Sequence, residues 1–205
     1  TSVNKNFHIE AVDLNPKAVA GLKKKFSTNN VTVRQADTLL DFKNDLFGDR
    51  NFFFNKIIGN PPYGAWQYLK KRELLKNMYG GYVKETYTLF LRKCIDLLKE
   101  NGRLVFIVPD TFLALHMHKD TREKILNNTK IEEIVLMPSR FFPGVNFGYS
   151  NLCIISFVKS VKDKDNVINI VSIKNSINAL YQIADGNYSV ADSFQSIPQE
   201  EVLRS

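Results

Sequence analysis

The chain has 205 residues, a formal net charge of +7 and a sequence pI near 9.3. Its length fits one domain, or one domain with a small appendage, and its hydrophobic fraction of 44% is sufficient for a core. It contains no apolar run of about 18 residues and no charged-then-apolar N-terminal stretch. We therefore expect a cytoplasmic protein with no transmembrane helix, no secretory leader and no membrane partner. The positive charge favours a polyanionic partner.

The cysteines and histidines do not form a pattern typical of a metal site. Cys94 and Cys153 lie in apolar, periodic segments, which is typical of buried free thiols in a reducing compartment. His116 and His118 lie close together in the sequence, and we expect both in a solvent-exposed loop. The sequence therefore predicts no bound metal.

The first third of the chain predicts strands that alternate with a helix. Residues 7–13 have the pattern of a short strand. A helix is predicted from Pro16 to Asn29, because proline suits a first helical turn and apolar residues then recur at helical spacing. A second strand is predicted at 31–34. A third, at 52–59, is nearly all apolar, which is typical of a strand buried on both faces of a parallel sheet.

The rest of the chain continues this alternation. Residues 66–81 are polar and basic, and we expect a mobile loop or a short helix there. An amphipathic helix is predicted over 84–100, with Asn101-Gly102 as its stop. The elements expected after it are a strand at 104–108, a helix at 118–128, and strands at 131–136, 152–158 and 167–173.

Strands that alternate with helices predict an α/β fold with a mostly parallel sheet, here ending in an antiparallel C-terminal hairpin. In such sheets, ligands bind at the carboxyl ends of the strands. Asp13, Asp37 and Asn60 each follow or end a predicted strand. Their order and placement indicate a binding site at one edge of the sheet.

A tetrapeptide follows the third predicted strand directly, and it consists of Asn60, Pro61, Pro62 and Tyr63. The exocyclic nitrogen of adenine is a poor nucleophile because its lone pair is delocalised into the ring. Hydrogen-bond acceptors on both N–H bonds favour a localised lone pair, and the Asn60 side chain and the Pro61 carbonyl are two such acceptors. Successive prolines hold the loop extended, so both oxygens are preorganised.

Tyr63 adds an aromatic face on which an unstacked base can stack, an interaction worth roughly 1–3 kcal/mol. The tetrapeptide therefore predicts methylation of nitrogen on a planar substrate such as adenine, from a sulfonium donor that needs alignment but no acid catalyst or metal. The competing interpretation is purely structural: a strand that ends in a Pro-Pro turn, with Tyr63 packed on the surface.

Four basic residues follow the tetrapeptide closely, namely Lys70, Lys71, Arg72 and Lys76. Their charges can contact DNA phosphates next to a bound base. The alternative is a solvated helix face with no ligand.

From about residue 7 to residue 159, the chain resembles the N6-adenine DNA methyltransferases of bacterial restriction–modification systems. The tetrapeptide at Asn60 matches the catalytic motif of that family in full. The resemblance implies a Rossmann-like methyltransferase sheet and S-adenosylmethionine as the cofactor. It also implies double-stranded DNA as the partner, with the target adenine flipped out because N6 cannot be methylated inside a stacked duplex.

The resemblance also assigns residues to the cofactor. Residues 12–18 are similar to the segment whose acidic residue binds the ribose hydroxyls, which gives Asp13 this role with Leu14 beside it, and Glu10 as the fallback. Residues 35–40 are similar to the segment that contacts the adenine amino group of the cofactor. That similarity gives this role to Asp37, followed by Thr38, and Asn60 also borders the cofactor.

A further segment, 141–145, resembles the motif whose aromatic residue stacks on the flipped base. Phe142 fits this role best and Phe141 less well. Without the resemblance, the alternative is that Phe142 is a core phenylalanine.

One part of the family pattern has no counterpart here. The family begins with a strand and a glycine-rich loop that wraps the methionine part of the cofactor, and no Gly-x-Gly occurs before Asp13. We expect a missing N-terminal segment or a partner subunit to complete the cofactor site, and we expect this chain alone to be inactive. Residues 1–174 are interpreted as a partial catalytic domain, and 175–205 as a linker toward an absent target-recognition domain.

Two other functions are compatible with the sequence. Methyltransferases that act on ribosomal RNA or on a release-factor glutamine carry the same tetrapeptide, because an amide nitrogen poses a similar chemical problem. The absent glycine loop leaves a non-catalytic remnant that binds DNA or a partner protein as an alternative of another class.

Overall fold

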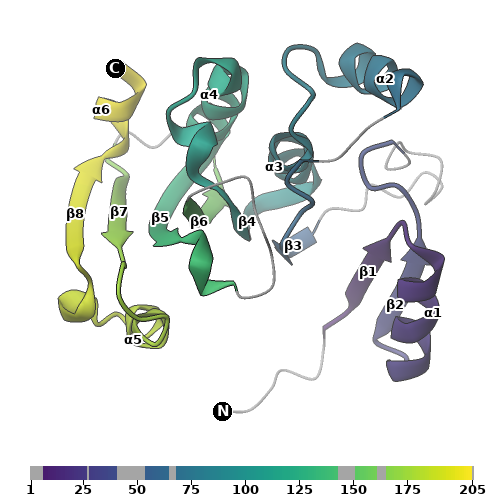
Figure 1. The fold of residues 1–205 in the computed structure, drawn as a ribbon, viewed down its shortest axis with the longest axis horizontal. Helices are drawn as coiled ribbons and strands as arrows, with labels where there is room; N and C mark the ends of the chain where they lie inside the picture. Colours follow the sequence, from purple (N-terminus) through teal and green to yellow (C-terminus); the bar gives the residue numbers. More distant parts are fainter. Residues whose placement is uncertain are drawn as a thin grey trace. The chain divides into compact units, whose positions relative to one another are not determined.

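The computed structural model describes residues 7–26, 28–40, 54–64, 68–142, 151–160 and 165–204. The chain divides into two compact units, Thr1–Phe52 and Phe53–Ser205 (Figure 1). No helix in the described residues is both long enough and apolar enough to cross a membrane.

The first unit is a β-α-β element built from β1 (Ile9–Asp13), α1 (Pro16–Lys25) and β2 (Val31–Gln35). The two strands are parallel, with Asp13 opposite Gln35. The Asn15 side chain accepts a hydrogen bond from the Lys17 backbone N–H at 2.9 Å and so caps the start of α1. The helix ends earlier than expected, after a last turn of three lysines that complement the negative end of the helix dipole.

The second unit is a six-stranded sheet in the order β3-β4-β6-β5-β7-β8. The β3–β4 and β5–β7 pairs are parallel, whereas β6 is antiparallel to both β4 and β5, and β8 is antiparallel to β7. This is the α/β fold with antiparallel strands toward the C-terminus that the sequence predicts. The strands are β3 (Phe54–Gly59), β4 (Leu98–Pro109), β5 (Thr129–Pro138), β6 (Asn151–Lys159), β7 (Val167–Ser172) and β8 (Ser193–Pro198).

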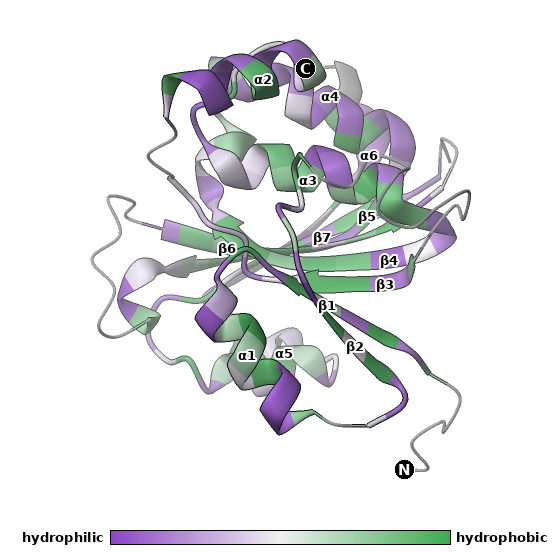
Figure 2. Cartoon of the chain, turned by 90° about the vertical axis from the view of Figure 1, so that its right-hand side faces the viewer, coloured by the Kyte–Doolittle hydropathy of each residue, from purple (hydrophilic) through white to green (hydrophobic). Residues whose placement is uncertain are grey.

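Helices cover both faces of this sheet. Figure 2 shows α3, α4 and α6 on one face and α5 on the other. The core lies between α3 and the sheet, where Tyr87 and Leu91 pack with Phe106 and Phe157. The helices are α2 (Leu69–Tyr79), α3 (Thr86–Leu97), α4 (Lys119–Asn128), α5 (Ala179–Ala184) and α6 (Gln199–Arg204), with short 3₁₀ turns η1 (Asp110–Leu113), η2 (His116–His118), η3 (Ser139–Phe141) and η4 (Tyr188–Val190).

The sequence predicts a third strand that is buried on both faces. Within the second unit this prediction is wrong, because only one face of β3 is covered. Lys56 is exposed and the Ile58 side chain is 85% exposed, whereas Ile57 packs against the core. Successive side chains of a strand point to opposite faces, and β3 is an edge strand whose pairing among the described residues is to β4 alone. The described part of this unit therefore covers only the Ile57 face of β3.

The predicted helix stop also has another role. Helix α3 ends at Leu97, and Asn101 and Gly102 lie inside β4, where the register with β3 shifts. Asn101 has a φ of 62°, and a Cβ on Gly102 would lie 2.9 Å from the Phe54 carbonyl oxygen. The Asn-Gly pair thus permits a β-bulge at a close backbone approach, instead of ending a helix.

The stretch interpreted as a linker contains α5, η4, β8 and α6, and β8 joins the sheet. The Gln199 side chain is buried and ties this region to the preceding elements. Its amide donates to the carbonyls of Leu126 (3.1 Å) and Thr129 (2.7 Å), and its oxygen accepts from the Ile131 N–H at 2.9 Å. One side chain therefore satisfies three backbone groups at the end of α4 and the start of β5.

The substitution Gln199→Leu should lower the free energy of unfolding by about 2–3 kcal/mol, because it leaves buried backbone groups without partners. Urea denaturation followed by circular dichroism measures this effect. Gln195→Leu on the exposed part of β8 is the matched control and should be nearly neutral. Equal denaturation midpoints for the two variants would contradict the assigned role of Gln199.

Candidate active site

The tetrapeptide lies where the sequence predicts it, directly after β3. Because β3 and β4 run parallel, Asn60 and Asp110 leave the sheet at the same edge. Asn60 and Pro62 are exposed, whereas Pro61 and Tyr63 are buried. The loop thus presents the Asn60 side chain outward and inserts Tyr63 into the protein.

Gly59 brings the strand close to its neighbour just before the tetrapeptide. A Cβ at this position would lie 3.2 Å from Cε1 of the Phe106 ring. The glycine therefore allows the end of β3 to lie against Phe106 on β4. This contact helps to set the position at which Asn60 leaves the sheet.

Tyr63 is a buried residue of the core, with 9% of its surface exposed. The structural interpretation that it packs on the surface is therefore wrong. Its ring meets the Tyr87 ring edge-on, at 6.4 Å between centroids and 82° between planes. Burial raises the pKa of Tyr63 to about 12, and the nearby Cys153 adds to this shift. The phenol therefore stays neutral at physiological pH.

The residue after the tetrapeptide is held to the start of α3. Gly64 and Glu85 form an isolated antiparallel bridge. Behind Tyr63, the Tyr87 hydroxyl is hydrogen-bonded to Oγ1 of Thr111 at 2.8 Å, at the end of β4. These contacts join the end of the tetrapeptide to a helix and to the neighbouring strand.

A cavity of about 160 Å³ lies at the same edge of the sheet, at the ends of β4, β5 and β7 and the start of β6. Asp110, Asn151 and Lys174 give it polar walls, and Met137 and Pro138 give it an apolar side. Burial raises the pKa of the Cys153 thiol above its usual range, and the negative charge of Asp110 adds to this shift. This mixture of groups suits a planar, polar ligand.

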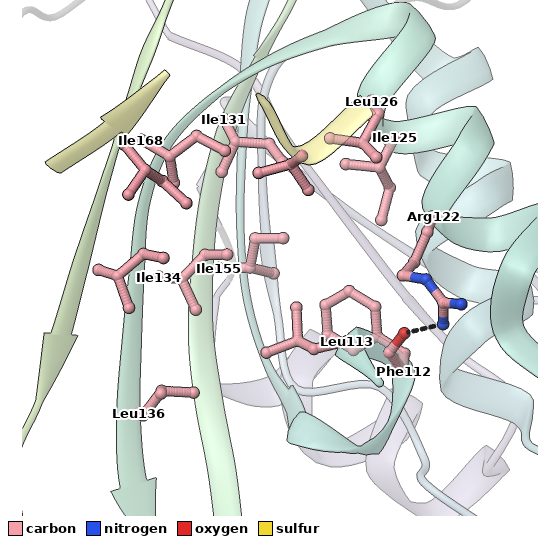
Figure 3. A pocket seen from close by; sticks show the side chains of 13 residues that line it. Phe112, Leu113, Arg122, Ile125, Leu126, Ile131, Ile134, Leu136, Ile155 and Ile168 are labelled. Atoms are coloured by element: carbon pink, nitrogen blue, oxygen red, sulfur yellow. Dashed lines mark hydrogen bonds between the residues drawn. The ribbon is translucent and has the colours of Figure 1, made fainter. Parts of the chain in front are cut away.

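A larger cavity, of about 250 Å³, has a different character (Figure 3). It lies between α4 and the sheet and is lined almost entirely by isoleucine, leucine and phenylalanine side chains. Its one charged lining residue is Arg122, which donates to the carbonyls of Phe112 (2.8 Å) and Leu115 (2.7 Å). It offers no set of polar groups that could orient a nucleobase.

Phe142 lies just after η3, at the end of β5, and is partly buried against the same core as Tyr63. Its backbone N–H donates to the Ser139 carbonyl at 3.0 Å. The neighbouring Phe141 ring lies under the Arg140 guanidinium at 5.7 Å. The remainder of the predicted aromatic motif, 143–145, lies outside the described residues.

In the first unit, the two candidate cofactor carboxylates lie at the ends of adjacent parallel strands. Asp13 accepts from the Asn15 N–H at 2.7 Å, and Asp37 accepts from the Leu39 N–H at 3.1 Å. The fallback, Glu10, is instead paired with Arg34 at 3.0 Å and is nearly buried. The structure therefore favours Asp13 over Glu10.

The residues next to these carboxylates differ in exposure. Leu14 is 58% exposed beside Asp13, whereas Thr38 is partly buried beside Asp37. An exposed leucine at a strand end offers an apolar surface to a ligand.

The basic segment forms helix α2. Lys70 and Lys76 are exposed and Lys71 and Arg72 are partly buried. Tyr68, at the start of the helix, is 88% exposed. The helix thus exposes two cationic side chains to solvent, and Tyr68 exposes an aromatic side chain just before it.

The expectation that His118 lies in an exposed loop is wrong. His118 is 1% exposed, and its Nε2 lies 2.8 Å from Oε2 of Glu85, whereas His116 is exposed. The sequence gives no local signal of this pair because the two residues come from separate elements. Within the described residues, no three His, Cys, Asp or Glu side chains are grouped to hold a metal ion.

The fold is that of the Rossmann-like, S-adenosylmethionine-dependent methyltransferases. A Listeria monocytogenes protein assigned to class I of these enzymes superimposes with a TM-score of 0.64 and 18% identity, over 88% of this chain and 55% of that chain. A modification subunit assigned to a type I restriction enzyme of Vibrio vulnificus gives a TM-score of 0.71 and 17% identity, over 95% of this chain and 44% of that chain.

The family follows from the sequence match. The Eco57I restriction-modification methylase model matches residues 4–142, and the chain belongs to this family. A curated relative, the type II methyltransferase M.HincII of Haemophilus influenzae, is 37% identical over 128 residues, which is 58% of this chain and 24% of the relative. The chain thus spans about a quarter of the length of that relative.

The buried His118 predicts a pH dependence of stability. Burial lowers the pKa of His118 below its ordinary value of 6.5, and the Glu85 carboxylate opposes this shift only in part. A lowered pKa means that the unfolded chain binds the proton more readily. The free energy of unfolding is therefore highest above about pH 6.5, where His118 is neutral in both states. It decreases as the pH falls toward the pKa of His118 in the folded state.

Urea denaturation at about pH 7, 6 and 5 should show this loss in the wild-type chain and a shallower loss in His118→Asn. The exposed His116→Asn variant should keep the wild-type pH slope. The assignment fails if His118→Asn also keeps that slope.

Proposed function

We propose that the full-length protein containing this chain methylates the N6 nitrogen of adenine in DNA, with S-adenosylmethionine as the donor, as part of a restriction–modification system. The observation that carries the proposal is the tetrapeptide Asn60 to Tyr63 at the carboxyl end of β3, with its last residue packed on α3. The family match and the methyltransferase fold support it.

The tetrapeptide supplies two acceptors for the amino group of the base. The exposed Asn60 side chain accepts one N–H through its amide oxygen, and the Pro61 carbonyl accepts the other. This arrangement localises the nitrogen lone pair and aims it at the methyl group. Both oxygens belong to a loop that is already fixed before the base arrives, so little reorganisation is needed in the transition state.

The proton that the methylated nitrogen loses does not go to Tyr63 in this proposal. The pKa of Tyr63 is raised to about 12, so the residue is present as a neutral phenol and not as a phenolate base. Neutral amide and carbonyl oxygens at Asn60 and Pro61 hold the hydrogens in place but do not retain a proton. The proton therefore passes to solvent after transfer.

The first unit fits the nucleoside part of the cofactor. Asp13 and Asp37 place carboxylates at the ends of two adjacent parallel strands, and a carboxylate can accept hydrogen bonds from ribose hydroxyls or from an adenine amino group. The exposed Leu14 offers an apolar surface for the adenine ring. When bound, S-adenosylmethionine supplies an activated methyl group on a positively charged sulfur.

The target base and its strand are assigned to the second unit. An adenine must leave the duplex to reach the tetrapeptide, and the partly buried Phe142 is the better candidate for stacking on it, because Tyr63 is buried in the core. The exposed Lys70 and Lys76, with Lys71 and Arg72, are the candidates for phosphate contacts. These phosphate contacts would position the DNA without reading its sequence.

The proposal is tested by incubating the full-length protein with tritiated S-adenosylmethionine and, in parallel, with DNA, ribosomal RNA or release factor. Label should enter DNA and should be recovered as N6-methyladenine after digestion to nucleosides. Label found only in RNA or only in protein would replace the DNA assignment by one of the other methyltransferase functions. No transfer to any substrate would favour a non-catalytic binding role.

Asn60→Ala in the full-length protein should lower the single-turnover rate of methyl transfer by about 10²-fold or more, because one preorganised acceptor is lost. The affinity for S-adenosylmethionine, measured by calorimetry, should change little. Asn55→Ala removes an exposed amide from β3, the strand that precedes Asn60, and is the control. A normal single-turnover rate in Asn60→Ala, with a large loss of cofactor affinity, would contradict this role.

A further inference from the structure

A buried polar pair lies behind the tetrapeptide, where the mechanism does not use it. Glu85 immediately precedes α3, and His118 ends η2 and precedes α4. The pair therefore joins the starts of two helices that pack on each other. Its atoms Oε2 and Nε2 are 2.8 Å apart, and the exposed fractions of the two side chains are 17% and 1%.

His118 is enclosed by aromatic rings. The Tyr82 ring contacts it edge-on with centroids 5.2 Å apart, and the Tyr87 ring is tilted against it at 6.0 Å. Its Nδ1 and Nε2 atoms are both buried, and neither has a well-directed hydrogen bond among the described residues, although Nε2 lies 2.8 Å from Oε2 of Glu85. A buried polar atom of this kind is destabilising by itself, so packing alone does not explain a histidine here.

Two routes connect this pair to the tetrapeptide. The first is the backbone: Glu85 forms a bridge with Gly64, the residue directly after Tyr63. The second is a row of rings, because Tyr87 contacts both His118 and Tyr63. The Glu85–His118 pair is therefore in contact, through one residue on each route, with the Tyr63 end of the loop.

The charges around His118 define how the pair acts. Glu85 faces it from the start of α3, Arg122 acts on it from α4, and Tyr82 and Tyr87 cover it as neutral rings. Nε2 of His118 and Oε2 of Glu85 are in close polar contact at 2.8 Å, and this contact restricts the rotamers of both side chains. His118 thus packs directly against the residue that is paired with the loop.

We propose that Glu85 and His118 are positioning residues, which hold the Tyr63–Gly64 end of the tetrapeptide so that the Asn60 and Pro61 oxygens are aligned for methyl transfer. This inference rests on the proposed function. Neither residue touches the substrate. Their effect is on the geometry of the acceptors, and therefore on the chemical step and not on cofactor binding.

The test compares His118→Phe with His118→Gln in the full-length protein. Phenylalanine keeps the ring packing but has no donor, whereas the glutamine amide nitrogen can occupy the place of Nε2. His118→Phe should lower the single-turnover rate by about 10- to 10²-fold, which is the effect expected of a displacement of about 1 Å. His118→Gln should recover most of the rate, and both variants should bind S-adenosylmethionine normally.

Glu85→Gln provides a second, independent variant if His118→Phe does not fold. It should lower the single-turnover rate while leaving the affinity for S-adenosylmethionine unchanged. His116→Phe, on the exposed neighbour, is the control and should be normal.

Wild-type rates in both His118→Phe and Glu85→Gln would overturn the inference. The inference would also be overturned if His118→Phe and His118→Gln lost rate in proportion to their loss of melting temperature, with no difference between the two variants. Asn60→Ala separates this inference from the function itself. If Asn60→Ala is inactive while His118→Phe is normal, only the positioning role fails; if Asn60→Ala is fully active, the proposed function fails.

Discussion

The parallel pairing of β3 with β4 is the constraint on which the candidate site depends. It brings the carboxyl ends of both strands to one edge of the sheet, where Asn60 and Asp110 leave the strands. Gly59 lets the end of β3 lie against the Phe106 ring, and this ring is itself buried. The contact therefore helps to set the position of the tetrapeptide loop relative to the sheet. The two prolines then limit the paths that the chain can take from this point. The pairing of the strands thus determines where the tetrapeptide loop lies.

The support for the loop comes from an unusual helix. The first two turns of α3 are largely buried, since β4 lies beneath the helix and α4 packs beside it. Buried polar side chains in such a helix need partners, and Tyr87 finds one in Thr111. The same burial that makes α3 rigid therefore makes its polar contacts specific. A polar network in a dry layer can hold a loop in one orientation more firmly than solvated contacts can.

Most elements could be predicted from the sequence, because apolar periodicity and turn residues are local signals. The predictions that failed concern features that depend on how other elements pack against a segment. The apolar run of β3 did not show that Ile58 faces no helix of its own unit, and Asn101-Gly102 indicated a turn without indicating that the turn lies inside a strand. The tetrapeptide was evident because its chemistry lies in consecutive residues. The Glu85–His118 pair was not, because it exists only after two distant segments have packed.

The exposed edge of β3 has a consequence for the physical behaviour of the isolated second unit. Among the described residues β3 pairs with β4 alone, and a strand paired on one side is a template for another strand. Lys56, exposed on the same strand, counters this tendency through charge repulsion between copies. Because salt screens such charges, self-association of this unit through β3 should increase with ionic strength.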